Sequence, residues 1–367
     1  MRVSFNPGSL KSFSSFFRYD VDFLDIYVTK DVVFIISNRQ DVYAHKAFSV
    51  ITREDVSGLV SFRVDKKEFL DLMCEGVVVL FVTESQVEIT FKPNNGFSYT
   101  MIRPYQASDV SGILQKHEIL AQRNKFSRIN LLSLEKHIRL IKGFSSSLYV
   151  RNNKLVCEDT NINLYVNISC ENLSLDTQTA QYLLSNCDTF FGFQNYIIGE
   201  GEDSVVIARQ LRGDPFGDDE IFLSKKATHR VRADLTPVCV LSRKASSSSV
   251  VYLNLDSGIC SIEEMSDSGT PYRMKFVTRF EVKEFISAQE VKQVSGLESF
   301  SIGDMGPVVV SARRIPELQF PLKLFKDQLS TINCRDVTVL LKKKFVQFNI
   351  GSDIVFVVRR SERSVTV

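Results

Sequence analysis

The chain has 367 residues, of which 44% are hydrophobic and 24% are charged. This composition excludes an intrinsically disordered chain and predicts a globular protein of two or three domains, because a single hydrophobic core rarely grows beyond about 250–300 residues. The 45 basic and 43 acidic residues leave a net charge of only +2. A uniformly basic surface is therefore excluded, and any contact with nucleic acid must depend on local clusters of charge.

The cysteines and the N-terminus indicate the compartment. Seven cysteines are widely spaced, and no two of them form a CxxC pair. An odd number without a disulfide framework is typical of reduced, mostly buried thiols in the cytoplasm. The N-terminus has no apolar stretch of signal-peptide length, and no apolar run approaches the roughly 18 residues of a membrane span. We expect a soluble cytoplasmic protein with no membrane segment.

The first hundred residues predict the same order of elements twice: one strand, one helix and three strands. Apolar residues alternate in the strands and recur every three or four positions in the helices. The first copy comprises a strand at 2–6, a helix at 9–18 and strands at 23–29, 32–37 and 42–50. The second comprises a strand at 60–64, a helix at 66–75 and strands at 77–82, 86–91 and 97–103.

The middle of the chain predicts the same order twice more. The third copy has a strand at 127–132, a helix at 133–143 and strands at 147–151, 154–158 and 162–168. The fourth has a strand at 172–175, a helix at 177–186 and strands at 189–198 and 203–210, which turn at 199–201.

The last third predicts two further copies with less regularity. The fifth has a strand at 229–233, a short helix at 235–244 and strands at 250–255 and 258–263, and strands near 273–281 and 307–313 follow. The sixth has a helix at 321–331 and strands at 336–341, 344–350 and 353–358. Repeats of this kind indicate one small unit used six times. Polar stretches at 107–126 and 211–228 pair the copies into three domains, at 1–120, 121–228 and 229–367.

Basic residues gather on the predicted helices. Four of the six helices carry more Lys and Arg than Asp and Glu, and on helix 133–143 three cations share the face opposite the apolar stripe. Such faces could contact phosphates without reading base sequence, although a solvated polar face is the alternative for any amphipathic helix. The candidate DNA-contacting residues are Lys11, Arg18, Lys66, Lys67, Lys136, Arg139, Lys142, Arg243, Lys244, Lys323 and Lys326.

Residue patterns that support catalysis are absent from the sequence. The four histidines are scattered, and no phosphate-binding glycine loop or nucleophile turn occurs. Asp20, Asp22 and Asp25 fit the exposed start of a strand, and the acidic segment 214–220 lacks the order of a calcium loop. We therefore predict no catalytic residue, no metal site and no cofactor.

The six-copy arrangement resembles the bacterial DNA polymerase sliding clamp, or beta clamp, family. Residues 60–91 resemble the family's second repeat, and 211–216 (LRGDPF) resemble its L-x-D-G-x-F-P segment. Residues 353–359 (DIVFVVR) resemble its last strand. The resemblance implies an α+β fold of three tandem clamp domains, each built from two βαβββ copies, with helices lining a ring and sheets outside.

The same resemblance implies a function and its partners. It implies a ring-shaped homodimer, closed head-to-tail, that encircles double-stranded DNA, is placed by a clamp loader and tethers a DNA polymerase. The implied partner-peptide pocket comprises Leu164, Pro215, Phe216, Val357, Val358 and Arg359.

This sequence departs from the family at two places. Residues 158–164 lack the Gly-His-Arg of the family's T-D-G-H-R-L motif, and RRSERSVTV replaces its short final segment. Such divergence is expected of a phage-encoded clamp. The alternatives are a monomeric clamp-like processivity factor and a β-rich viral structural or assembly protein, with an enzyme last.

Overall fold

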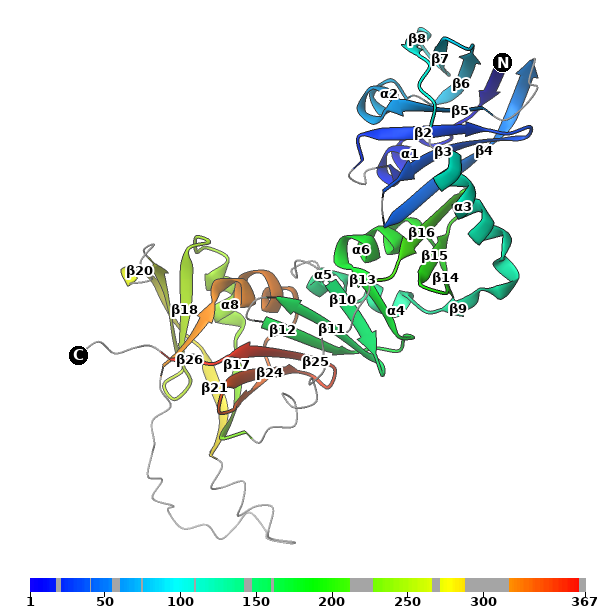
Figure 1. Ribbon diagram of the computed structural model, residues 1–367. Coiled ribbons are helices and arrows are strands. Elements are labelled where there is room, and N and C mark those ends of the chain that lie inside the picture. Colours follow the sequence, from blue (N-terminus) through cyan, green and yellow to red (C-terminus); the bar gives the residue numbers. More distant parts are fainter. Residues whose placement is uncertain are drawn as a thin grey trace, which may run out of the picture. The chain divides into compact units, whose positions relative to one another are not determined.

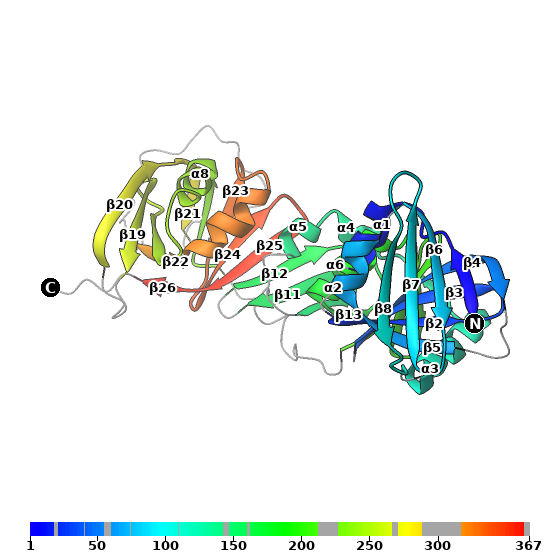
Figure 2. The same cartoon turned by 90° about the horizontal axis from the view of Figure 1, so that it is seen from above.

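The computed structural model in Figures 1 and 2 describes residues 1–17, 21–39, 41–54, 60–73, 75–108, 110–141, 147–159, 162–211, 227–265, 271–287 and 317–362. The fold is α+β, as the sequence predicts. The chain divides into two compact units. The first comprises Met1–Glu135 and Gln178–Leu211, and the second Lys136–Thr177 and Arg212–Val367.

The first two βαβββ copies, called repeats below, form as predicted. The first repeat contains β1 (Arg2–Phe5), α1 (Leu10–Phe16), β2 (Phe23–Val28), β3 (Val32–Asn38) and β4 (Val42–Glu54). The second contains β5 (Val60–Asp65), α2 (Lys66–Leu72), β6 (Gly76–Val82), β7 (Gln86–Pro93) and β8 (Tyr99–Pro104). Each helix buries its apolar face, with Phe13 and Phe16 in α1 and Phe69 in α2.

The two repeats exchange strands. β1, which precedes the helix of the first repeat, pairs antiparallel with β6, which follows the helix of the second. In the reverse direction β5 pairs with β2. Because each repeat places its first strand in the other repeat's sheet, neither could satisfy its backbone hydrogen bonds alone.

The third and fourth repeats follow a helix that the sequence analysis missed. The elements of this region are α3 (Val110–Ala121), η1 (Arg123–Lys125), β9 (Ser127–Ile129), α4 (Leu132–Glu135), α5 (Ile138–Ile141), β10 (Ser147–Arg151), β11 (Lys154–Asp159) and β12 (Ile162–Asn167). They continue with β13 (Leu173–Asp176), α6 (Thr177–Asn186), β14 (Thr189–Phe193), β15 (Tyr196–Glu200) and β16 (Ser204–Arg209). The exchange recurs, since β9 pairs with β14 and β13 with β10.

Three predictions in this region were wrong. α3 occupies most of the stretch read as a polar break at 107–126, because Ile113 is buried against a cluster that includes Tyr43 and Ile207. The predicted strand 189–198 is two strands, which turn where Gln194 adopts a positive φ of 53°. The predicted helix 133–143 is two short helices, and the chain passes between the two compact units where they break.

The last two repeats complete the pattern. The fifth contains β17 (His229–Asp234), α8 (Thr236–Ser242), β18 (Ser249–Asn254), β19 (Ile259–Met265), β20 (Pro271–Arg279) and β21 (Glu281–Ser287). The sixth contains β22 (Leu318–Pro321), the π-helix η2 (Leu324–Gln328), η3 (Leu329–Thr331), β23 (Val337–Leu341), β24 (Phe345–Ile350), β25 (Ile354–Arg359) and β26 (Ser361–Glu362). β17 pairs with β23 and β22 with β18. The strand predicted near 307–313 lies outside the described residues.

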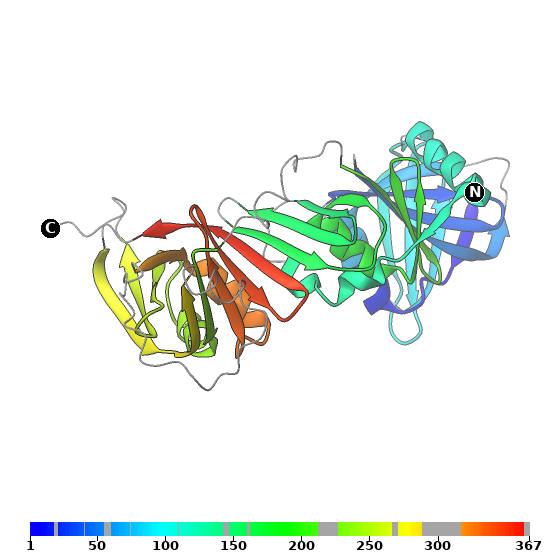
Figure 3. The same ribbon diagram turned by 90° about the horizontal axis from the view of Figure 1, so that it is seen from below.

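The third strand after each helix follows a second rule. In the first compact unit, β4 and β16 pair antiparallel over Val42–Lys46 and Ser204–Ala208. In the second unit, β12 and β25 pair over Ile162–Val166 and Ile354–Val358. Two third strands remain, β8 and β20, and within the described residues each pairs only with the preceding strand of its own repeat. β20, yellow in Figure 3, lies at the edge of its five-stranded sheet.

The predicted boundaries at 120 and 228 stay a prediction, because the two compact units divide the predicted middle domain between them. None of the described helices is both long enough and apolar enough to cross a membrane. Six of the seven cysteines lie within the described residues, and all six are buried free thiols.

Candidate functional site

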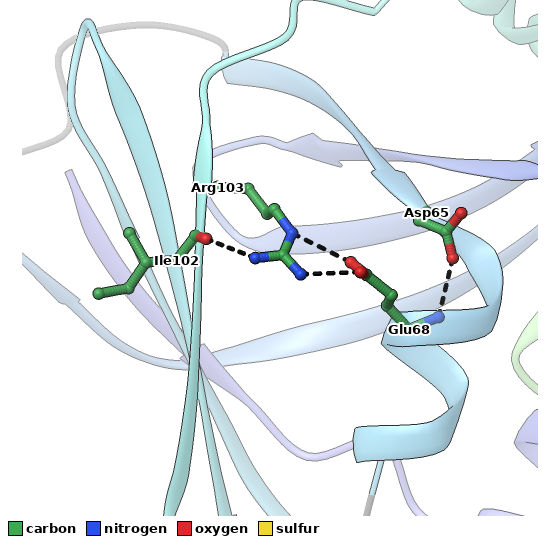
Figure 4. A network of polar contacts seen from close by, with 4 residues as sticks. All are labelled: Asp65, Glu68, Ile102 and Arg103. Atoms are coloured by element: carbon green, nitrogen blue, oxygen red, sulfur yellow. Dashed lines mark hydrogen bonds and ion pairs between the residues drawn. The ribbon is translucent and has the colours of Figure 1, made fainter.

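The start of α2 presents two of the candidate cations. Lys66 is half-buried and Lys67 is exposed. The next residue, Glu68, is acidic, and its carboxylate is paired with Arg103 of β8. Arg103 donates to it from Nε at 3.0 Å and from Nη2 at 2.8 Å. Figure 4 shows this two-pronged contact, which raises the pKa of Arg103 through its hydrogen bonds to Glu68. The negative charge of α2 is therefore partly compensated from a strand that sequence analysis did not connect with it.

Backbone groups fix the same network. The Asp65 carboxylate accepts a hydrogen bond from the Glu68 amide at 2.8 Å, which caps the N-terminus of α2. Arg103 also donates from Nη1 to the Ile102 carbonyl at 2.9 Å, so its side chain lies along β8 (Figure 4). The cap and the ion pair thus position the first turn of α2 against β8.

The break in the predicted helix 133–143 removes the single helical face on which three of the candidate cations were expected. Lys136 is exposed in the turn between α4 and α5, so it does not share a helical face with Arg139. The break lets Leu134 and Leu140 both become buried, which one continuous helix wheel did not predict. The side chains of Arg139 and Lys11, and the residues Arg18 and Lys142, lie outside what the structure describes.

Two candidate cations hold α8 and η2 together. Arg243, at the end of α8, donates from Nη2 to the Ser330 carbonyl at 2.7 Å. Lys326 of η2 donates from Nζ to the Ala245 carbonyl at 2.9 Å. Each cation therefore satisfies a carbonyl beyond the C-terminal end of the other helix, where positive charge is favourable. Arg243 stays exposed, and Lys326 is half-buried.

The other two cations of this helix pair also keep partial access to solvent. Lys244 is exposed after the end of α8, and Lys323 is half-buried just before η2. The two helices pack side by side. Of the four cations on this helix pair, Arg243 and Lys326 bind carbonyls of the neighbouring helix, and all four keep some exposure to solvent.

A pocket of about 420 Å³ opens in the second compact unit. Strands β18 and β22 and the junction of β25 with β26 form its walls, and the lining residues are Val250, Gln319, Phe320, Pro321, Val358, Arg359, Arg360 and Ser361. Val358 and Arg359 belong to the partner-peptide pocket expected from the family resemblance. The structure therefore brings two of those six residues to one cavity.

The other members of that expected set lie elsewhere or outside the described residues. Leu164 is buried and pairs across β12 and β25 with Phe356. Val357 is buried on the opposite face of β25, against Val156 and Tyr165. Pro215 and Phe216 lie outside the described residues.

Sequence reasoning missed most of the pocket lining. Val250, Phe320 and Pro321 come from β18 and β22, which are adjacent only because the fifth and sixth repeats exchange strands. The one local signal was the Arg359–Arg360 pair at the end of an apolar strand.

His45 of β4 and His117 of α3 form a histidine pair in the first unit. The Tyr43 hydroxyl contacts His45 Nδ1 at 3.1 Å and His117 Nε2 at 3.3 Å, and the two imidazole rings stack. Burial lowers the pKa of His45 from 6.5 to about 3, helped by the neighbouring His117, and burial also lowers the pKa of His117. This cluster joins α3 to β4. Across the described part of the chain, no three His, Cys, Asp or Glu side chains lie close enough to hold a metal ion.

Comparison with solved structures identifies the fold. The chain is similar to the DNA polymerase III beta chain of Streptococcus pneumoniae, at 12% identity and a TM-score of 0.66 over 99% of this chain and 100% of that one. It is similar to the DNA polymerase sliding clamp of Bacillus subtilis, at 11% identity and a TM-score of 0.65 over 99% of each chain. The beta subunit of Pseudomonas aeruginosa gives 13% identity and a TM-score of 0.62 over 99% of this chain and 100% of that one.

No protein-family model and no curated protein matches the sequence. The structure nevertheless defines the class, because the likeness extends over nearly the whole of each chain. This protein has the fold of the bacterial DNA polymerase sliding clamp, as the repeat pattern predicted.

Proposed function

We propose that this protein is a sliding clamp, a processivity factor that encircles duplex DNA as a head-to-tail homodimer and tethers a DNA polymerase. The observation that carries the proposal is that two third strands, β8 and β20, have no third-strand partner within the part of the chain that the structure describes. Third strands of other repeats pair antiparallel at β4–β16 and β12–β25. Pairing β8 of one subunit with β20 of the next would extend the same rule between chains and close a ring.

The side chains of the two edge strands, β8 and β20, support this joint. Tyr99 and Ile102 on β8 are each 53% exposed, and Phe97 just before β8 is 86% exposed. Val277 on β20 is 56% exposed. Exposed apolar residues on an edge strand would promote aggregation unless a partner covers them.

A hollow beside β20 offers room for the partner's side chains. It measures about 370 Å³ and is lined by Pro237, Val240 and Leu241 of α8, with Thr236, Lys244 and Thr278 of β20 completing its wall. Apolar side chains that precede or lie on β8, such as Phe97, match the lining in chemistry. We therefore assign the hollow to the subunit joint.

The charged helices support a sequence-independent contact with DNA. Lys67, Lys136 and Lys244 are exposed on or beside three helices, as required for contacts with phosphates. Arg103 compensates Glu68 and so makes the surroundings of α2 less acidic than its sequence suggests. No step of this role requires catalysis or a cofactor.

The pocket between β18, β22 and β25 supports a docking role. Its apolar lining and its position at the end of a strand suit a short peptide from a polymerase or a clamp loader. A clamp acts where DNA is copied, so the proposal places the protein in the cytoplasm, at the nucleoid or at a replication site in a host cell. A phage origin stays a prediction from sequence divergence.

Processivity on closed and open templates tests the proposed function. The protein should lengthen the products of its cognate polymerase on primed circular DNA and have little effect on linear DNA, because a ring slides off free ends. Changing Lys136, Arg139 and Lys142 together to Ala should reduce this effect, whereas Lys154→Ala on β11 should not. Equal stimulation on both templates, with steep salt dependence, would favour a monomeric factor instead.

The mass in solution provides an independent test. Sedimentation at micromolar concentration should give a dimer. A monomer would count against the ring, and large assemblies without any effect on DNA synthesis would favour a viral structural protein.

A further inference from the structure

The helical segment 322–331 of the sixth repeat changes its hydrogen-bond register twice. Leu322 and Lys323 begin it as an α-helix, η2 continues it as a π-helix, and η3 ends it as a 3₁₀-helix. A π-helix uses more residues per turn than an α-helix, and a 3₁₀-helix uses fewer. The two distortions offset each other, so the same residues could form one regular α-helix without the gain or loss of a residue.

One backbone amide of this segment is shared between two registers. The Leu329 amide donates to the Leu324 carbonyl, five residues back, and to the Phe325 carbonyl, four residues back. The first bond belongs to the π register and the second to the α register. The preceding residue, Gln328, has a φ of −106° and a ψ of −70°, away from the roughly −63° and −42° of an α-helix. The backbone therefore lies between two conformations.

The side chain of Gln328 is buried and has no hydrogen-bond partner in the described part of the chain. It is 0% exposed, and both Nε2 and Oε1 are unsatisfied, which is unfavourable for a buried amide. Four apolar side chains of the segment are also buried, those of Leu322, Leu324, Phe325 and Leu329. At 100° per residue, a regular α-helix would place Gln328 about 75° from their mean direction, at the border of the buried face. The α register would therefore relieve the unpaired amide.

Other contacts of the segment favour the register seen here. Lys326 Nζ donates to the Ala245 carbonyl at 2.9 Å, and the Lys326 carbonyl accepts a hydrogen bond from the Ser330 hydroxyl. The Leu324 side chain is fully buried, whereas a regular α-helix would bring it toward the border of the buried face. Opposing contributions of this kind define a two-state element, which a ligand shifts if it binds one state more tightly.

We propose that segment 322–331 is a register switch that responds to the phosphates of duplex DNA. The π register is the resting state, in which Lys326 is bound to the Ala245 carbonyl. Contact with phosphate draws Lys326 away from that carbonyl, the segment becomes one α-helix, and Gln328 leaves the core. Phosphate binds the α register more tightly because only there is Lys326 free of a protein acceptor. The inference rests on the proposed function, since duplex DNA supplies the phosphates.

Hydrogen exchange of the full-length protein, measured by mass spectrometry, tests the switch. With excess duplex DNA of about 24 bp at about 50 mM salt, amides of 322–331 should exchange about tenfold more slowly than in the free protein. The reason is that one regular series of hydrogen bonds replaces the shared bond at Leu329. Amides of β23 in the same repeat are the reference and should not change.

Two variants should shift the switch in opposite directions. Gln328→Leu removes the unpaired amide from the core, so it should raise the melting temperature by about 2–4 °C and weaken binding of the labelled duplex about fivefold. Ser330→Ala removes the hydroxyl that holds the Lys326 carbonyl. It should slow exchange of 322–331 without DNA and tighten binding of the duplex about twofold. A purely structural role of Gln328 would lower stability and affinity together.

Gln347→Leu is the matched control. Gln347 of β24 is 7% exposed, and its Oε1 also has no partner among the described residues, but it lies outside the helical segment. Its replacement should leave both the affinity for the duplex and the exchange of 322–331 unchanged.

Unchanged exchange of 322–331 at a DNA concentration that saturates fluorescence anisotropy would overturn the inference. A Gln328→Leu variant that binds the duplex as tightly as the wild type would overturn it as well. The proposed function fails separately. A dimer that stimulates synthesis on circular DNA without a change of register sinks only the inference, and a monomer whose segment 322–331 responds to duplex DNA sinks only the ring.

Discussion

Strands β4 and β8 occupy the same position in consecutive repeats and have different surroundings. β4 pairs with β1, β3 and β16, and its residues Tyr43 and Ala44 are buried. β8 pairs with β7 alone among the described strands, and Tyr99 and Ile102 are half exposed. The repeat specifies a strand with two hydrogen-bonding edges, and whether the second edge finds a partner depends on which other repeat lies next to it. A joint made within the chain contributes to folding, whereas a joint left open is available for association.

The polar contacts of β4 are also more buried than those of β8. β4 carries Tyr43 and His45, which are buried and meet the half-buried His117 of α3. β8 carries Arg103, whose ion pair with Glu68 lies at the surface. Buried contacts of β4 should therefore govern stability, and exposed contacts of β8 should govern association.

The largest effect is expected inside the β4–β16 joint. Ile207 of β16 lies opposite Tyr43 and is 1% exposed, so Ile207→Asp should lower the free energy of unfolding by about 4 kcal/mol or more through an unpaired buried charge. Urea denaturation measures the change. Ile51→Asp, at a 55% exposed position of β4, is the control and should cost less than about 1 kcal/mol. Similar losses at both positions would contradict the assignment of β4–β16 as a structural joint.

The second-largest effect is expected from acid, which should lower the stability of the first compact unit. The pKa of His45 is about 3 in the folded protein and 6.5 ordinarily, so the unfolded chain binds more protons between these values. Stability should fall as the pH drops below about 6.5, by up to about 1.4 kcal/mol per pH unit for this histidine. Denaturant titrations from neutral pH to pH 4 measure the slope.

Two histidine variants test whether His45 causes this dependence of stability on pH. His45→Gln should reduce it, whereas His229→Gln, in the second compact unit, should leave the first unit's response unchanged. An unchanged slope in His45→Gln would show that other groups cause the acid sensitivity.

Opening the proposed subunit joint should have an intermediate effect. Ile102→Asp on β8 should raise the dimer dissociation constant about 10- to 100-fold, because a charge then lies in a desolvated contact. Sedimentation velocity across a concentration series measures this constant, and urea denaturation should show little loss of monomer stability. Phe81→Asp on β6, also exposed but away from the strand edge, is the control. A dimer unaffected by Ile102→Asp would remove β8 from the joint.

The smallest effect is expected at the surface ion pair of Arg103 and Glu68. Each single change to Ala should lower stability slightly, and high salt should abolish the difference, because both side chains are exposed. A double-mutant cycle measures the coupling between the two residues. Coupling that persists in high salt would indicate that the pair does more than orient α2 against β8.

Much of the fold could be predicted from local patterns. The apolar spacing in α1 and α2 and the alternation in β6 and β7 are set by each segment's need to bury one face. Asn152 and Asn153 separate the predicted strands 147–151 and 154–158, and both residues adopt the positive φ that a tight turn needs. The turn at Gln194 was missed, although the polar pair Gln194–Asn195 interrupts the apolar run between Phe193 and Tyr196.

The pocket could be predicted only in part. Val358 and Arg359 followed from the resemblance of one terminal strand, whereas Val250 and Phe320 depend on contacts between strands far apart in the sequence. Lys342–Lys344 and Arg359–Arg360 are two short charged runs that are separate along the chain and adjacent only through the pairing of β24 with β25.

The sequence by itself determined the unit and its number, because hydrophobic periodicity is a local property of each segment. Only the tertiary structure decided which repeat exchanges strands with which, and which third strands remain at an edge. The pairings between third strands join residues more than a hundred positions apart, as in Tyr43 with Ile207 and Leu164 with Phe356. Backbone hydrogen bonds between strands are nearly independent of side-chain identity, so the sequence does not record them locally.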